Sequence, residues 1–140
     1  MSDYLRKIIL LLVIIIISYS CREEIIEPDN LVETVNNPVQ VRENNSYILL
    51  LNAENFTMNL TVPSIFTSIR TRFNITLIDY ESGYTRISVQ DYNSVERFRY
   101  FIADDVNYHS ELLDGYVPTN INIHTENFSG KVKIEFRRTL

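Results

Sequence analysis

The segment KVKIEFR at residues 131–137 alternates apolar and charged residues at every step. Successive side chains of an extended chain point to opposite faces, so this alternation predicts a strand with one buried and one wet face. Val132, Ile134 and Phe136 are expected to face inward, and Lys131, Lys133, Glu135 and Arg137 to face water. One wet face is typical of an antiparallel sheet.

The same period of two recurs upstream, at residues 56–62, 73–77, 87–90, 97–102 and 120–124. The uninterrupted apolar run at 48–51 indicates a strand buried on both faces or central in its sheet, and residues 39–42 could begin the first strand. About 7–8 short strands within residues 38–140 predict an all-β fold. We expect an antiparallel two-sheet β-sandwich of immunoglobulin-like or related Greek-key type.

The connections between these strands carry turn signals. Residues 80–84 and 126–130 each contain a glycine, Gly83 or Gly130, and are predicted to be hairpin loops. Alanine is rare after residue 20 while β-branched and aromatic residues abound, which argues against helices. Residues 64–70 and 110–114 could each hold a single helical turn.

Length and composition narrow the class of protein. A chain of 140 residues suits one domain, and its apolar fraction of 45% suffices for a packed core. The net charge of −5 disfavours binding to nucleic acid. A single cysteine, Cys21, excludes an internal disulfide and a cysteine-based zinc site, and no cofactor is expected.

The N-terminal twenty residues have the pattern of an export signal. Two basic residues at 6–7 precede ten consecutive aliphatic residues at 8–17. Ten are too few for a membrane-spanning helix, which needs about 20, but they match the apolar segment of a signal peptide. Small residues, Ser18 and Ser20, stand at the −3 and −1 positions before Cys21. Residues 1–20 are therefore predicted to be a signal peptide.

This segment resembles the lipobox of bacterial lipoproteins, with Ser18 where that family usually has an aliphatic residue. The resemblance implies that Cys21 is lipidated (diacylglycerol and a further acyl chain such as palmitate) and becomes the first mature residue. The following Arg22, Glu23 and Glu24 resemble the acidic export signal of Bacteroidota lipoproteins. The implied location is the outer membrane, with the cell surface favoured over the periplasmic face. A secreted protein with a free thiol and an uncleaved anchor are the alternatives.

The acidic segment at residues 21–37 is predicted to form a flexible tether between the lipid and the domain at 38–140.

Within the domain, the candidate catalytic bases are His109, expected in a polar loop, and His124, expected on a solvated strand face. No nucleophile-elbow, zinc-protease or phosphate-binding motif occurs, so we expect no enzymatic activity.

An oxygen-rich loop at residues 104–111 is the weak candidate for a metal site. Calcium prefers six to eight oxygen ligands, and this loop offers carboxylate and amide oxygens. Its spacing matches no EF-hand, and acidic loops at sandwich ends are commonly just soluble turns, so no metal is expected. The candidate ligands are Asp104, Asp105, Asn107 and Glu111, with Asp91 from a neighbouring loop.

Exposed aromatic residues are the candidates for partner or ligand contact. Tyr offers a rigid surface with a polar tip, which suits protein interfaces and stacking on sugar rings. Such residues also cap sandwich edges without any partner. The candidates are Tyr84, Tyr92, Tyr108 and Tyr116 in or beside loops, and Phe101 on a polar strand face.

The sequence thus predicts a non-catalytic accessory lipoprotein that docks onto a larger envelope complex. The alternative is a glycan-binding surface lipoprotein in which Tyr84, Tyr92 or Tyr108 stacks on sugars. The absence of Trp counts against that alternative, because Trp is the usual stacking residue.

Overall fold

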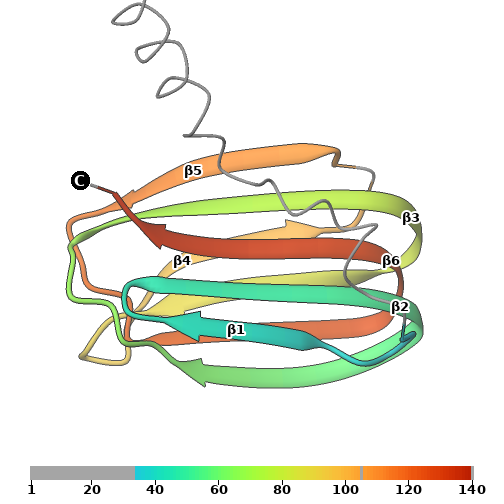
Figure 1. Ribbon diagram of the computed structural model, residues 1–140, viewed down its shortest axis with the longest axis horizontal. Coiled ribbons are helices and arrows are strands. Elements are labelled where there is room, and N and C mark those ends of the chain that lie inside the picture. The colour runs from blue at the N-terminus through green and yellow to red at the C-terminus, as the bar shows by residue number, and fades with distance from the viewer. Residues whose placement is uncertain (1–33, 105, 140) are drawn as a thin grey trace, which may run out of the picture.

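The computed structural model describes residues 34–104 and 106–139, and all regular elements in them are β-strands (Figure 1). The predicted signal peptide, Cys21 and the export signal at Arg22, Glu23 and Glu24 lie outside the described residues. Every strand pairing is antiparallel, which confirms the predicted all-β class. The strands are β1 (Val39–Glu43), β2 (Ser46–Pro63), β3 (Arg70–Gln90), β4 (Glu96–Ile102), β5 (Tyr108–Asp114) and β6 (Asn120–Arg138). Within the described ranges, no helix could cross a membrane.

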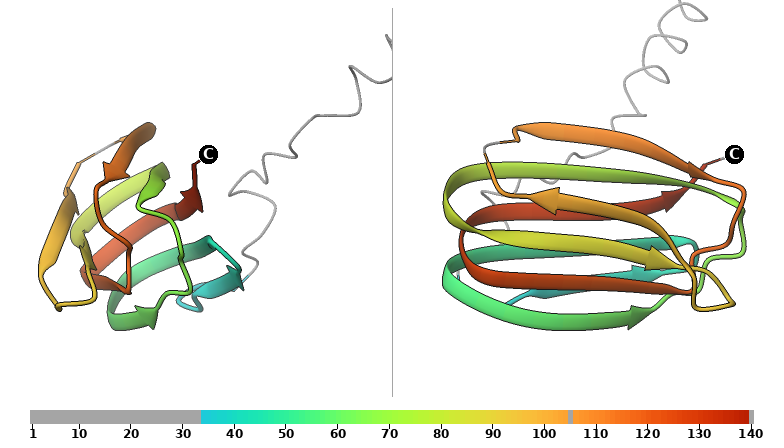
Figure 2. Two further views of the ribbon diagram at one scale, coloured as in Figure 1. Left: turned by 90° about the vertical axis from the view of Figure 1, so that its left-hand side faces the viewer. Right: turned by 180° about the vertical axis from the view of Figure 1, so that it is seen from behind.

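The six strands form one sheet in the order β1-β2-β6-β3-β4, with β5 also paired to β3. The strands β2, β3 and β6 are 18, 21 and 19 residues long, and each bends back near its middle. The sheet therefore folds over itself into two layers (Figures 1 and 2). Three of the strand boundaries predicted from sequence fall inside these long strands, and β5 is a strand that was not predicted, so six strands replace the expected seven or eight.

We name the layers after their edge strands. The β5 layer contains β1, β5, residues 46–53 of β2, 70–78 of β3 and 130–138 of β6. The β4 layer contains β4, together with residues 56–63 of β2, 84–90 of β3 and 120–126 of β6. The two layers pack face to face as a sandwich, and the core lies between them.

The two predicted hairpin loops, at residues 80–84 and 126–130, are bends within single strands. β3 pairs with β6 on both sides of the bend, so neither strand folds back to pair with itself. Positive φ angles occur at Asp79 (54°), Gly83 (78°) and Asn127 (48°), accompanied by shifts in the pairing register. The prediction was wrong because the glycine that marks a hairpin turn also permits a bulge that bends a continuous strand.

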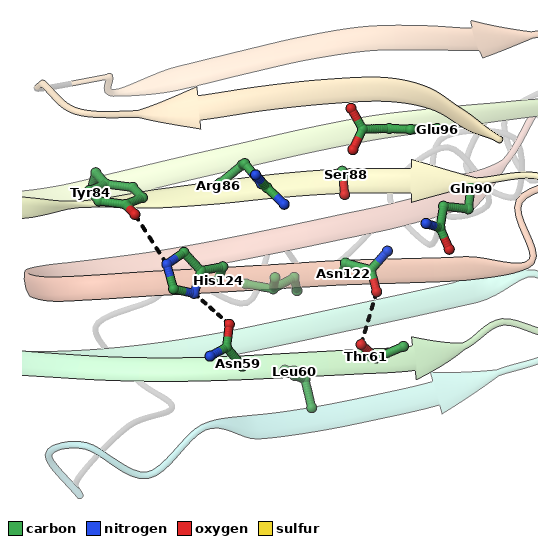
Figure 3. Close-up of a pocket in the computed structure, with 11 residues that line it drawn as sticks. Asn59, Leu60, Thr61, Tyr84, Arg86, Ser88, Gln90, Glu96, Asn122 and His124 are labelled. Atoms are coloured by element: carbon green, nitrogen blue, oxygen red, sulfur yellow. Dashed lines mark hydrogen bonds between the residues drawn. The ribbon is translucent and has the colours of Figure 1, made fainter. Parts of the chain in front are cut away.

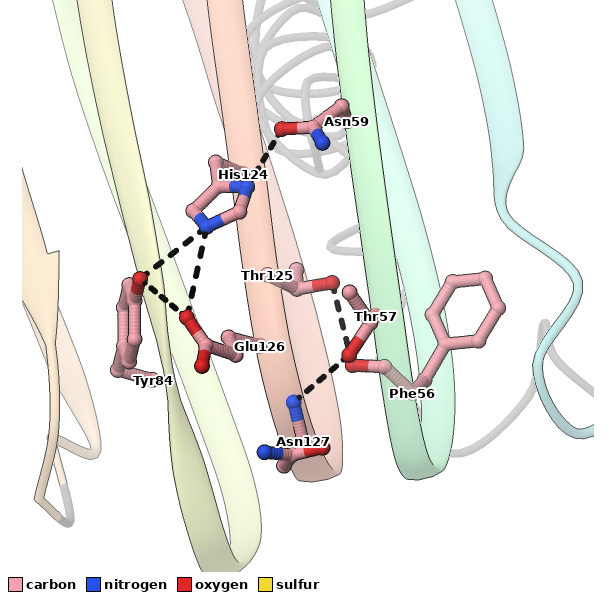
Figure 4. Close-up of polar contacts among 8 residues, drawn as sticks. All are labelled: Phe56, Thr57, Asn59, Tyr84, His124, Thr125, Glu126 and Asn127. Carbon is pink, nitrogen blue, oxygen red and sulfur yellow. Dashed lines mark hydrogen bonds and ion pairs between the residues drawn. The ribbon is translucent and has the colours of Figure 1, made fainter.

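The three bends interlock at one end of the sandwich. The backbone N–H of Asn55 donates to the Ser129 hydroxyl at 2.9 Å. The backbone N–H of Asn127 donates to the Thr57 hydroxyl at 3.1 Å, as Figure 4 shows. Gly83 packs directly against the backbone carbonyl of Asn127. These contacts hold the turning points of β2, β3 and β6 side by side, and so fix how the two layers face each other.

Aromatic residues connect the layers across the core. The Phe73 ring of β3 lies 5.0 Å from the Phe98 ring of β4 and 5.1 Å from the Phe136 ring of β6, centroid to centroid. Val132, Ile134 and Phe136 are each at most 1% exposed, as their alternation predicts. The apolar run at 48–51 lies in β2, between β1 and β6, with its last three residues buried.

The charged face of β6 differs from the prediction. Lys133 and Glu135 are only 9% and 8% exposed, and their charged groups pair at 3.5 Å. Arg137 also pairs with Glu135. β6 lies between β2 and β3, so neighbouring side chains cover its outer face from both sides. Alternation identifies which face a residue occupies but not whether that face is wet.

The two predicted helical turns are absent from the described residues. Residues 64–69 form an irregular connection in which Phe66 is buried, and residues 110–114 belong to β5, paired with the start of β3. The last part of the predicted tether contacts β2, because the backbone N–H of Asn36 donates to the Asn52 carbonyl at 2.8 Å. Residues 39–43 form β1, as expected from their alternation.

Candidate functional site

The outer face of the β4 layer carries an open groove with a volume of about 470 Å³ (Figure 3). All four strands of the layer contribute side chains to it, because alternate residues of each strand point away from the core. Most of the side chains that define it are polar and uncharged. These include Asn59 and Thr61 from β2, Asn122 and His124 from β6, and Ser88 from β3, and the charged Arg86 of β3 lies among them.

The strand register arranges these side chains in rows across the layer. One row runs from Asn59 through His124 and Arg86 to Phe101. The next row runs from Thr61 through Asn122 and Ser88 to Arg99. Neighbouring strands lie about 4.7–4.9 Å apart, so the rows form a regular grid of hydrogen-bonding groups.

Hydrogen bonds hold the His124 ring on both sides (Figure 4). Its Nδ1 donates to the Asn59 amide oxygen at 2.5 Å, since that oxygen can only accept. Its Nε2 lies 3.1 Å from the Tyr84 hydroxyl, which donates to Glu126 at 2.7 Å. The hydrogen bond to Glu126 raises the pKa of Tyr84. The network therefore fixes the orientation of the imidazole at the edge of the groove.

The middle of the groove combines a fixed pair with free hydrogen-bonding groups. The Thr61 hydroxyl donates to the Asn122 amide oxygen at 2.9 Å, which leaves the Asn122 NH₂ group available. Ser88, 2% exposed, lies at the floor. Within the described ranges, the side chains of Arg86 and Gln90 make no hydrogen bond. These groups can bind a ligand without first breaking an internal contact.

The aromatic residues proposed from sequence as one contact set do not gather in one place. Tyr84 lines the groove, and Phe101, 53% exposed, lies beside Arg86 on the same face. Tyr92 is 80% exposed in the loop after β3, and Tyr108 is 63% exposed at the start of β5, on the other layer. Tyr116 is half-buried, and burial raises the pKa of its hydroxyl to about 12.

Most of the residues that line the groove are not among the site residues predicted from the sequence. Asn59 and Asn122 lie in the alternating segments at 56–62 and 120–124, and Arg86 immediately precedes the one at 87–90, but none of the three is among the predicted site residues. His124 does lie on an outward strand face, but its side chain is only 30% exposed and is hydrogen-bonded. The alternation marks Asn59 and Asn122 as outward-facing, but only the strand order brings them together with Arg86.

The two histidines lie on opposite sides of the β4 layer. His109 lies in β5, not in the predicted loop, and stacks on Tyr100 with a centroid distance of 4.7 Å. His109 therefore extends from β5 toward β4 between the two layers, while His124 lies on the outer face of the β4 layer.

The predicted oxygen-rich loop does not assemble a metal-binding group among the residues that the structure describes. Asp104 and Asn107 are exposed in the connection between β4 and β5, and Glu111 lies in β5 beside His109. Asp105 lies outside the described residues.

Asp91, the fifth candidate ligand, organises its own loop. It is 2% exposed, and its Oδ1 accepts hydrogen bonds from the backbone N–H groups of Asn93 at 2.8 Å and Val95 at 3.1 Å. Its Oδ2 accepts from Arg97 Nε at 2.7 Å. The bond from Arg97 holds the pKa of Asp91 below its usual value, assisted by the backbone bonds and opposed by burial.

The lowered pKa makes the stability of this loop dependent on pH. A carboxylate whose pKa is lower in the folded state than in the unfolded chain stabilises the fold at pH values above its pKa in the unfolded chain. That contribution disappears as pH falls through the folded-state value. We expect Asp91→Asn to lower the unfolding temperature at pH 7. The difference in unfolding temperature between the variant and the wild type is expected to disappear below about pH 3.8. Thermal unfolding from pH 7 to pH 2 measures this. Exposed Asp104→Asn is the control, and a pH-independent gap would contradict the assignment.

Comparison with known proteins gives matches only among solved structures. No protein-family profile and no curated protein sequence matches the chain. Among solved structures, mutants of a family 29 carbohydrate-binding module in complex with mannohexaose and with cellulohexaose both align with a TM-score of 0.40 and 14% identity. Each alignment covers 71% of this chain and 74% of the other. At this level of likeness, the function of the groove has to be inferred from its own side chains.

Proposed function

We propose that this chain is a non-catalytic glycan-binding protein whose ligand lies in the groove of the β4 layer. The observation that carries the proposal is the row-by-row placement of amide, hydroxyl and imidazole groups along an open groove. A sugar hydroxyl both donates and accepts hydrogen bonds. Asn59, Thr61 and Asn122 also carry both functions, so they can satisfy such a hydroxyl in either direction.

The aromatic residues of the same face add a second mode of sugar contact. Phe101 is 53% exposed and lies across from Arg86 in the strand register. An exposed aromatic ring can stack against the apolar face of a sugar ring, while polar groups alongside bind its hydroxyls. Tyr84 in the groove and Phe101 beside it can thus supply the stacking surface that Trp commonly provides.

The composition of the groove favours a glycan over other ligands. A site for an apolar small molecule is lined mainly by hydrophobic side chains, and a protein interface has an apolar core. This face presents Asn, Thr, Ser and His instead. The predicted accessory subunit of an envelope complex therefore has less support than glycan binding.

The carboxylates of the groove support binding without hydrolysis. Glycosidases generally place two carboxylates on either side of the scissile bond. Among the described residues that line this groove, Glu96 is the only carboxylate, and it pairs with Arg99 at 2.5 Å.

The proposal is tested by screening the full-length protein, purified in mild detergent, against immobilised polysaccharides and an oligosaccharide array. We expect retention on at least one polysaccharide, with elution by the corresponding soluble oligosaccharide. A protein that binds no glycan but co-purifies with a stoichiometric protein partner would instead support the accessory-subunit function.

We further propose that a lipid on Cys21 holds this domain at the outer membrane, on the cell surface. A lipoprotein's acyl chains exceed the single chain that gives only reversible membrane binding. We expect Cys21→Ser to move the protein from the membrane fraction to the soluble fraction. Fractionation of the native host measures this, with an integral outer-membrane protein as the control. Retention of the variant in membranes would refute lipid anchoring at this residue.

A further inference from the structure

Arg86 is an unpaired cation inside the groove. It lies between His124 of β6 and Phe101 of β4 in the strand register, and it is half-buried (Figure 3). In the part of the chain that the structure describes, its guanidinium makes no hydrogen bond or ion pair. The other two arginines of this region are paired, Arg97 with Asp91 at 2.7 Å and Arg99 with Glu96 at 2.5 Å.

The lack of a partner has an energetic consequence. A guanidinium stays charged at all physiological pH values, and partial removal of a charge from water is unfavourable unless a counter-charge compensates it. Its planar fork of N–H donors matches a carboxylate, with which it can form two parallel hydrogen bonds. Arg86 can therefore gain both a counter-charge and hydrogen bonds from an anionic ligand.

The carboxylates nearby are already engaged. Glu96, which lines the groove, pairs with Arg99, and Glu126 accepts the hydrogen bond of Tyr84. Of the two charged side chains among the described residues that line the groove, Glu96 has an ion pair and Arg86 has none, although the whole chain has a net charge of −5. Attraction of an anion to this position comes from the local arrangement and not from the overall charge.

We infer that the groove binds an acidic glycan, in which the carboxylate or sulfate of one sugar residue pairs with Arg86. The inference rests on the proposed glycan-binding function and specifies its ligand class. Phe101 lies next to Arg86, so the ring of the same acidic sugar can stack on it. Asn59, which His124 holds in place, and Asn122 bind the hydroxyl groups of that sugar and of its neighbours.

The test compares matched acidic and neutral polymers on the full-length protein by affinity electrophoresis and calorimetry. One pair is polygalacturonate and its carboxyl-reduced neutral product, and the other is dextran sulfate and dextran. We expect one acidic polymer to bind about tenfold tighter than its neutral counterpart. One charge-assisted hydrogen-bonded pair with Arg86 supplies a gain in affinity of this size. Preference in the first pair indicates a carboxylate, and preference in the second a sulfate.

Two variants identify the residue responsible. Arg86→Gln is expected to weaken binding to the acidic polymer more than binding to its neutral counterpart, so that the acidic preference disappears. Arg70→Gln, at the exposed start of the same strand, removes one positive charge elsewhere and should leave the preference intact. Equal binding of acidic and neutral polymers would overturn the inference but leave glycan binding standing. An equal loss of the acidic preference in both variants would also overturn the inference, because it would show that the acidic polymer is attracted by the positive charges of the protein in general and not by Arg86. Failure to bind any polymer would overturn both proposals.

Discussion

The double variant Asn122→Ala/His124→Ala is expected to bind glycan about 100-fold more weakly than the wild type. Both side chains lie on β6 at the centre of the groove, in adjacent rows of the grid. The Asn122 substitution removes hydrogen bonds to sugar hydroxyls that are worth about 0.5–1.5 kcal/mol apiece. Loss of His124 also frees Asn59 and Tyr84 from their fixed positions.

The matched control is the double variant Asn74→Ala/His109→Ala. It removes the same two residue types, but from β3 and β5 on the opposite layer. We expect this control to retain wild-type affinity in titration calorimetry with the oligosaccharide that elutes the protein. Comparable losses in the two double variants would show that the groove is not the binding site. Circular dichroism of both variants separates lost binding from lost folding.

Gly83→Ala is expected to lower the free energy of unfolding by about 3–5 kcal/mol. Gly83 has a φ of 78°, which an alanine adopts only with strain, and its added Cβ would come closer than 3.0 Å to the Asn127 backbone carbonyl. The clash is with backbone, so no side chain can move to relieve it. The substitution therefore pushes the bend of β3 away from that of β6.

Gly115→Ala separates strain from crowding. Gly115 has a φ of 86°, but a Cβ there would meet nothing within 4 Å. We expect Gly115→Ala to lower the free energy of unfolding by only about 1 kcal/mol, because the strained backbone conformation is its only cost. Urea unfolding of the two variants measures the difference. If Gly83→Ala failed to fold while Gly115→Ala folded normally, the interlocked bends would also be supported. Equal effects would mean that the bends do not depend on this contact.

The strands and their inward faces could be predicted from sequence because alternation is a local signal. Residues 132, 134 and 136 illustrate this, since their pattern alone placed them in the core. The bends could not be predicted, because Gly83 and Gly130 give the same local signal for a hairpin and for a bulge. Only the long-range pairing of β3 with β6 distinguishes the two.

The groove could be predicted only in fragments. The outward direction of Asn59, Arg86 and Asn122 follows from their strands, but these residues are far apart in sequence. Their juxtaposition depends on the order β2-β6-β3-β4, in which the last long strand lies between the first two. Exposed aromatic residues were a poorer guide, since Tyr92 and Tyr108 lie away from the groove.

The side-chain amide resonances of the full-length protein in detergent micelles test the central claim most directly. The oligosaccharide that elutes the protein from its polysaccharide is titrated in while these nuclear magnetic resonance signals are followed. We predict that the NH₂ signals of Asn59, Gln90 and Asn122 in the groove will shift and saturate, while that of Asn74 on the opposite layer stays in place. Saturable shifts at Asn74, with the three groove signals unmoved, would contradict glycan binding in this groove.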